Sequence, residues 1–148
     1  MGDSAAQGGS QPPGPQVAGR VSLVIPAYNR AALIGQTLTS VIQADYRALE
    51  VVVADDGSTD GTADVVTRFA REHPDLLLHL LRLPHAGAVA ARNRGVAAAS
   101  GEFVLFLDSD DLLAGLGLTA MVAELADPTI PYCVGRLIEQ DLSGNQQF

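Results

Sequence analysis

Short apolar runs alternate along the chain with longer stretches whose apolar residues recur every three or four positions. The runs at residues 21–25, 49–54 and 103–107 have the length and the aliphatic content of buried β-strands. Residues 76–83 are a further strand candidate, although their leucines would also suit a helix. The helical spacing predicts helices over residues 33–42, from Thr59 or Asp60 to Pro74, over residues 86–99 and over residues 112–126. A fifth strand at residues 132–139 and a turn at residues 143–144 are predicted to follow.

This alternation of strands and helices predicts an α/β fold. Strands linked through helices form β-α-β units, so most of the sheet should be parallel and covered by helices on both faces. The 148 residues suffice for one core, and we expect a single domain over residues 20–148. Residues 1–19 are rich in Gly, Pro, Gln and Ser and are predicted to form a disordered tail.

The composition narrows the classes of function. A net charge of −8 argues against nucleic acid as a partner, because nucleic-acid phosphates need a basic protein surface. All 9 basic residues are arginine, which excludes a phosphate-loop lysine and a Schiff base on lysine. Cys133 is the only cysteine, which excludes an internal disulfide and a cysteine-based metal cluster.

The hydropathy pattern bears on location. No apolar run approaches the roughly 20 residues that cross a bilayer. The first residues also lack the basic start and apolar centre of a signal peptide. We therefore expect a cytoplasmic protein without a transmembrane segment, and peripheral association with a membrane stays open.

Polar residues follow the predicted strands directly. They are Tyr28 and Asn29 after the first strand, Asp55 and Asp56 after the second, and Asp108 and Asp110 after the fourth. Ligands of parallel α/β sheets bind beyond the carboxyl ends of the strands, where loops and helix N-termini meet. The sequence therefore predicts that distant stretches bring carboxylates to one edge of the sheet.

These residues allow both a functional and a structural interpretation. Asp108 and Asp110 have the oxygen ligands that Mg²⁺ or Mn²⁺ prefers, but they would also suit the start of the next helix. Tyr28 offers an aromatic face to a planar base, or it packs at the edge of the sheet. Arg92 or Arg94 could reach a phosphate, or each could be a solvated surface arginine.

Four blocks resemble the family-2 glycosyltransferases, whose catalytic domain has the GT-A (Rossmann-like) fold. In order, the blocks read VSLVIPAYNR, VVVADDGSTDGT, ARNRGVAAASGEF and VLFLDSDD. The similarity runs from Val21 to about Leu125. His85 departs from the family pattern, in which asparagine is frequent at this position.

The resemblance implies a nucleotide-sugar donor, most often a uridine diphosphate sugar, and a divalent cation, Mg²⁺ or Mn²⁺. The implied donor-binding residues are Pro26, Ala27, Tyr28 and Asn29 around the base, Asp55 and Asp56 at the base, Arg92 and Asn93 over the donor, and Asp108 at the ribose or sugar. Asp110, with Asp108, is implied to hold the metal under the diphosphate. The acceptor, whether carbohydrate, lipid or protein, is not specified.

The resemblance also implies an inverting transfer, in which a carboxylate deprotonates the acceptor hydroxyl. Family members carry this general base on a later segment, often in a Glu-Asp pair, and no such pair occurs before Phe148. We therefore expect the general base beyond Phe148 and the chain to be the N-terminal, nucleotide-sugar-binding part of a truncated GT-A domain.

Two other hypotheses stay open at this point. The chain could be a catalytically incomplete module that binds a nucleotide sugar without transferring it. A strand that ends in Asp108-x-Asp110 also fits the nucleophile motif of haloacid-dehalogenase-type phosphatases. That class needs a later cationic residue, which is commonly lysine, and this chain has no lysine.

Overall fold

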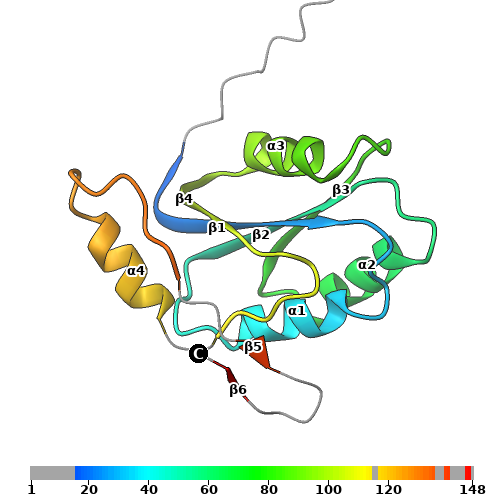
Figure 1. The fold of residues 1–148 in the computed structure, drawn as a ribbon, viewed down its shortest axis with the longest axis horizontal. Helices are drawn as coiled ribbons and strands as arrows, with labels where there is room; N and C mark the ends of the chain where they lie inside the picture. Colours follow the sequence, from blue (N-terminus) through cyan, green and yellow to red (C-terminus); the bar gives the residue numbers. More distant parts are fainter. Residues whose placement is uncertain (1–15, 115–116, 136–138, 141–145, 148) are drawn as a thin grey trace, which may run out of the picture.

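The computed structural model shows an α/β domain built on a parallel sheet (Figure 1). It describes residues 16–114, 117–135, 139–140 and 146–147. The strands of the sheet are β1 (Val17–Ala27), β2 (Leu49–Asp55), β3 (Leu77–Arg82) and β4 (Gly101–Phe106). They pair in the order β3-β2-β1-β4, and every pair is parallel. The predicted fold class is confirmed.

Helices cover both faces of this sheet (Figure 1). Helices α1 (Ile34–Ile42) and α2 (Thr62–Glu72) lie on one face, and α3 (Ala88–Ala98) lies on the other. The remaining elements are α4 (Leu118–Leu125) and a small antiparallel pair, β5 (Glu139–Gln140) with β6 (Gln146–Gln147).

The central strands β1 and β2 are buried on both faces, which explains why their sequences are mostly apolar. The core against α1 and α2 takes alternate residues, among them Leu23, Ile25 and Val53. The intervening Val24 and Val52 are fully buried. Burial on both sides fixes the central strands, and with them the loops at their carboxyl ends.

Helix α3 approaches the sheet closely because it presents small residues. Ala91 and Gly95 are its buried positions. A Cβ atom at Gly95 would overlap the Val24 side chain on β1. This close approach determines where the first turn of α3 meets the end of β1.

We expect Gly95→Val to lower the free energy of unfolding by about 1–3 kcal/mol, because overpacking forces the helix away from Val24. Ala97→Val is the matched control, since Ala97 is exposed on the same helix. Urea denaturation of both variants measures the difference. Equal unfolding free energies would show that α3 does not depend on this contact.

Strand β1 starts earlier than its apolar pattern indicates. The predicted tail of residues 1–19 overlaps the strand, which begins at Val17. The Val17 N–H donates to Ser100 O at 2.8 Å, and the Gly19 N–H donates to a Glu102 carboxylate oxygen at 2.7 Å. Backbone pairing with the start of β4 therefore extends the strand without an apolar pattern. Residues 1–15 lie outside the described residues.

The helix predicted over residues 112–126 begins only at Leu118, and that prediction was wrong for its first part. The Leu113 N–H donates to Ser40 Oγ on α1 at 2.9 Å, which holds this segment extended. The Asp45 carboxylate accepts the N–H groups of Gly117 and Leu118, each at 3.2 Å. A carboxylate at a helix N-terminus satisfies unpaired N–H groups and favours helix initiation there.

The predicted strand at residues 132–139 is wrong over residues 132–135, which have no regular secondary structure. Tyr132 and Val134 are 74% and 81% exposed, so their alternation with smaller residues does not reflect a buried face. Residues 136–138 and the predicted turn at 143–144 lie outside the described residues.

Candidate functional site

Three loops converge at the carboxyl edge of the sheet. Tyr28 follows β1, Asp56 follows β2, and Asp108 follows β4. Together they line a pocket of about 370 Å³. The predicted site residues that line it are Pro26, Ala27, Tyr28, Asp56, Arg92, Asp108 and Asp110. The structure therefore brings most of the predicted residues together from separate stretches of sequence.

Three other predicted residues, Asn29, Asp55 and Asn93, do not line this pocket. Asn29 adopts a left-handed conformation with φ of 52°, and its side-chain oxygen accepts the Thr59 N–H at 2.9 Å. Buried Asp55 accepts the Ser58 N–H at 3.1 Å. Asn29 and Asp55 thus shape the loops behind the pocket, and Asn93 is exposed on α3. Their donor-binding role stays a prediction.

Asp56 fixes the loop that precedes α3. Its Oδ1 accepts the Ala86 N–H and its Oδ2 accepts the Gly87 N–H, both at 2.8 Å. The Ala86 hydrogen bond is the main reason that the pKa of Asp56 lies below its ordinary value; burial opposes this shift, and Gly87 and His85 add to it. The stabilisation from Asp56 is therefore complete above the ordinary carboxyl pKa and is lost as the pH falls through the lowered one.

An aromatic pair forms one wall of the pocket. The rings of Tyr28 and His85 stack with centroids 4.3 Å apart and an angle of 26° between their planes. His85 Nδ1 lies 2.8 Å from Asp56 Oδ2. The sequence marks His85 as a departure from the family pattern near the donor, and His85 lines the pocket. No spacing rule identifies a lone loop histidine as a pocket residue.

The loop after β4 combines carboxylates with two arginines. Asp108 Oδ1 accepts from Arg92 Nη2 at 2.5 Å, and Asp110 Oδ2 lies 3.5 Å from Arg30 Nε. Burial raises the pKa of Asp111, and the charges of Asp108 and Asp110 raise it further. A concentration of negative charge that already perturbs a neighbouring carboxyl favours a bound cation. Arg30 was missed from the sequence, although it lies in the same block as Tyr28.

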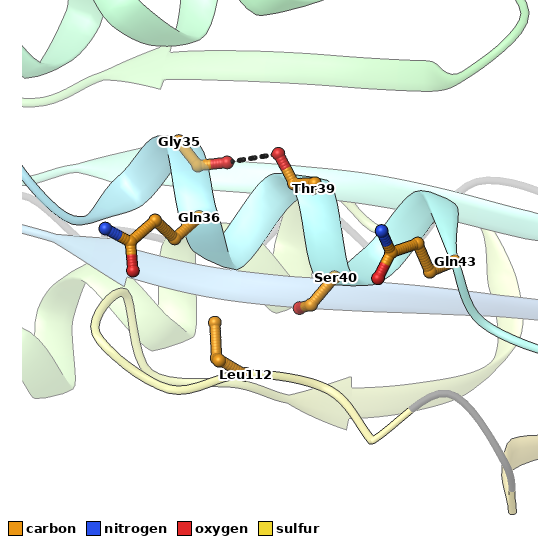
Figure 2. A pocket seen from close by; sticks show the side chains of 6 residues that line it. All are labelled: Gly35, Gln36, Thr39, Ser40, Gln43 and Leu112. Carbon is orange, nitrogen blue, oxygen red and sulfur yellow. Dashed lines mark hydrogen bonds between the residues drawn. The ribbon is translucent and has the colours of Figure 1, made fainter. Parts of the chain in front are cut away.

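Helix α1 holds this acidic loop in place. Thr37 Oγ1 donates to Ser109 O at 3.0 Å, and both residues are buried. Just beyond, α1 and Leu112 border a second hollow of about 310 Å³, lined by Gly35, Gln36, Thr39, Ser40, Gln43 and Leu112 (Figure 2). No charged side chain lines it. The pocket with the carboxylates and arginines is therefore the candidate site.

The donor set suits a divalent cation that is shared with a ligand. In the part of the chain that the structure describes, no group of three or more His, Cys, Asp or Glu residues could hold a metal ion alone. Asp108 and Asp110 offer two half-exposed carboxylates on one loop. Mg²⁺ and Mn²⁺ are commonly bound by one or two carboxylates together with water and phosphate oxygens. The two aspartates fit such an ion when a diphosphate completes its coordination.

Two solved structures of similar fold contain nucleotide sugars. The mannosyltransferase PcManGT from Pyrobaculum calidifontis, in complex with GDP-Man and Mn²⁺, superimposes with a TM-score of 0.74 at 41% identity, over 84% of this chain and 39% of that one. S. aureus TarS in complex with UDP-GlcNAc gives a TM-score of 0.66 at 35% identity, over 73% of this chain and 31% of that one. The fold is that of the GT-A class of glycosyltransferases.

The family follows from the sequence match. Residues 22–147 match the family described as Glycosyl transferase family 2, and the chain belongs to that family. A Campylobacter jejuni relative, GalNAc(5)-diNAcBac-PP-undecaprenol beta-1,3-glucosyltransferase, is 30% identical over 129 residues, which are 87% of this chain and 42% of that protein. The chain thus spans less than half the length of that relative. The predicted resemblance is confirmed, and the phosphatase hypothesis is wrong.

Among the described residues, no helix is both long enough and apolar enough to cross a bilayer. The cytoplasmic location expected from the sequence stays a prediction.

Proposed function

We propose that this chain binds a nucleoside diphosphate sugar together with Mg²⁺ or Mn²⁺ and forms the donor-binding part of an inverting glycosyltransferase. The observation that carries this proposal is the convergence of Tyr28, Asp56 and the 108–110 loop on one pocket. The three parts supply an aromatic surface, a fixed loop and a metal-binding carboxylate pair. A nucleotide sugar needs all three.

The charges suggest how the donor lies. Tyr28 and His85 would form the base end, and Pro26 and Ala27 line the same pocket. At the other end, Arg30 and Arg92 each pair with an aspartate and are positioned to move onto phosphate oxygens. The diphosphate would therefore lie near Asp108 and Asp110.

The start of α3 adds to the phosphate end. Gly87 is its N-cap residue, and both Gly87 and Ala88 line the pocket. Free N–H groups at a helix N-terminus attract phosphate. Together with the two arginines, they supply the positive charge that an acidic chain otherwise lacks.

The proposed donor is a uridine diphosphate sugar. PcManGT carries GDP-Man and TarS carries UDP-GlcNAc, so relatives of similar fold accept two different bases. The acceptor is a hydroxyl of a carbohydrate, a lipid or a protein. The pocket described here bears on the donor and does not discriminate among these acceptors.

In the proposed mechanism, the residues of this pocket position the donor. Arg30 and Arg92 would hold the diphosphate, and Asp108 and Asp110 would hold the cation. The cation, when bound, would neutralise charge on the departing nucleoside diphosphate. Deprotonation of the acceptor hydroxyl by a carboxylate would contribute about 10²–10⁴-fold to the rate.

Thermal denaturation with UDP and MnCl₂ tests this proposal. Binding to the folded state alone adds about 2.7 kcal/mol of stability at a ligand concentration of 100 Kd, so the midpoint should rise. UDP with EDTA and UMP with MnCl₂ are the controls, since each removes one partner of the metal–diphosphate unit. No shift with UDP or GDP in the presence of MnCl₂ would overturn the proposal. Binding without sugar transfer or donor hydrolysis would favour the incomplete binding module.

A further inference from the structure

The acidic loop after β4 exposes two carboxylates but buries the residue between them. The side chains of Asp108 and Asp110 are 52% and 47% exposed, whereas Ser109 is 6% exposed. The carbonyl of Ser109 belongs to the planar peptide unit that ends at the Cα atom of Asp110. A contact that fixes this carbonyl therefore also fixes the starting point of the Asp110 side chain.

Helix α1 holds this loop at two points. Thr37 and Ser40 lie three positions apart, so their side chains are on the same face of the helix. Thr37 Oγ1 donates to Ser109 O at 3.0 Å, and Ser40 Oγ accepts the Leu113 N–H at 2.9 Å. The two hydroxyls thus anchor the loop at both of its ends.

The hydroxyl of Thr37 is not explained by packing alone. Thr37 is fully buried on α1 beside the apolar residues Ile34, Leu38 and Val41, which are also buried. A valine would have a similar shape and no polar group to bury. A buried hydroxyl destabilises the fold unless it makes a hydrogen bond. The presence of threonine therefore points to the bond with Ser109 O.

This anchor has a task because the loop carries like charges. Asp108, Asp110 and Asp111 lie within four residues. Burial raises the pKa of Asp111, and the charges of Asp108 and Asp110 raise it further. Repulsion favours separation of the carboxylates, whereas a shared cation needs Asp108 and Asp110 close together. The hydrogen bonds from α1 hold the backbone of the loop in place against this repulsion.

We propose that Thr37 is a positioning residue that sets the affinity of the donor pocket for its divalent cation by holding the 108–110 loop. This inference rests on the proposed function. Thr37 does not line the pocket, so it acts on the cation only through the loop. Loss of groups that orient metal ligands typically lowers metal affinity by about 10–100-fold. Binding of the nucleotide without the cation should not depend on Thr37.

Calorimetric titration with UDP tests the inference, at a fixed subsaturating concentration of MnCl₂ and in EDTA. The ratio of the two affinities measures the contribution of the cation. In Thr37→Val this ratio should fall about 10-fold, while the affinity in EDTA stays within about twofold of that of the wild-type chain. Thr37→Ser keeps the hydroxyl and should retain the wild-type ratio.

Thr39→Val is the matched control. Thr39 is exposed on the same helix, and its Oγ1 donates to Gly35 O at 2.8 Å within α1 (Figure 2). This variant makes the same chemical change and should leave the ratio unchanged. An equal loss of affinity with and without the cation in Thr37→Val would indicate a merely structural role and would contradict the inference.

The outcomes separate the inference from the proposal beneath it. If folded Thr37→Val retains the wild-type ratio, the inference is overturned and the proposed function stands. If the folded wild-type chain binds neither UDP nor GDP in MnCl₂, both are overturned. If Thr37→Val does not fold, Ser40→Ala takes its place, because it removes the acceptor of the Leu113 N–H at the other end of the loop. Its ratio should fall in the same way, and a wild-type ratio in folded Ser40→Ala would overturn the inference.

Discussion

Asp110→Asn is expected to lower the affinity of the chain for UDP in MnCl₂ by about 100-fold or more. Alteration of groups that only support a metal ligand typically costs about 10–100-fold, and loss of a ligand charge should cost at least as much. Asp110 is half-exposed beside Arg30. Asparagine has the size of this side chain but lacks its negative charge. Calorimetric titration of both proteins measures the change.

The difference between the proteins should depend on the metal. In EDTA, the wild-type chain and Asp110→Asn should bind UDP with similar, weak affinity, because the carboxylate then has no cation to hold. Asp64→Asn is the matched control, since its carboxylate is 86% exposed on α2, away from the pocket. A wild-type affinity in Asp110→Asn would contradict the assignment of this aspartate to the metal.

Glu50→Ala is expected to lower the free energy of unfolding by about 3 kcal/mol. Glu50 is 2% exposed and accepts hydrogen bonds from Ser22 Oγ, from Ser100 Oγ at 3.0 Å and from the Ser100 N–H at 2.8 Å. The substitution leaves a cavity, and it leaves the buried Ser22 hydroxyl on β1 and the partly buried Ser100 donors just before β4 without an acceptor. Urea denaturation at pH 7 measures the loss. Glu72→Ala, on the exposed end of α2, should change stability by less than about 0.5 kcal/mol.

The same network should respond to acid. Burial raises the pKa of Glu50, but the hydrogen bonds from Ser22 and Ser100 and the nearby His79 outweigh burial, so the net pKa is lowered from 4.5. The stabilisation is therefore complete above pH 4.5 and is lost as the pH falls through the lowered value. In Glu50→Gln the decline of stability in acid should be shallower than in the wild-type chain. Parallel acid profiles would show that protonation of Glu50 does not cause the loss of stability in acid.

The apolar runs of the sequence predicted the strands well because β1 and β2 are buried on both faces. A strand that is buried on both faces has few polar positions, so its apolar run stands out in the sequence. The position of Asp56, Asp108 and Asp110 at one edge then followed from parallel pairing. The sequence could therefore predict the common location of these side chains, but not their partners.

The errors arose where distant residues decide the local structure. The start of α4 depends on the Asp45 carboxylate, which accepts a hydrogen bond from the Leu118 N–H. The two residues lie far apart in the sequence. The early start of β1 depends on pairing of its backbone with residues near Gly101. His85 gains its contacts only when the ends of β1 and β2 are adjacent in the sheet. No local pattern in the sequence contains this information.

The stack of Tyr28 on His85 gives the protein an optical probe of its own. The chain has no tryptophan and 3 tyrosines, so its ultraviolet emission comes from those phenol rings. Tyr46 is hydrogen-bonded to Gly19 O, and Tyr132 lies on the exposed surface. A molecule that displaces or covers the Tyr28 ring should therefore change a measurable share of the fluorescence, without any attached dye.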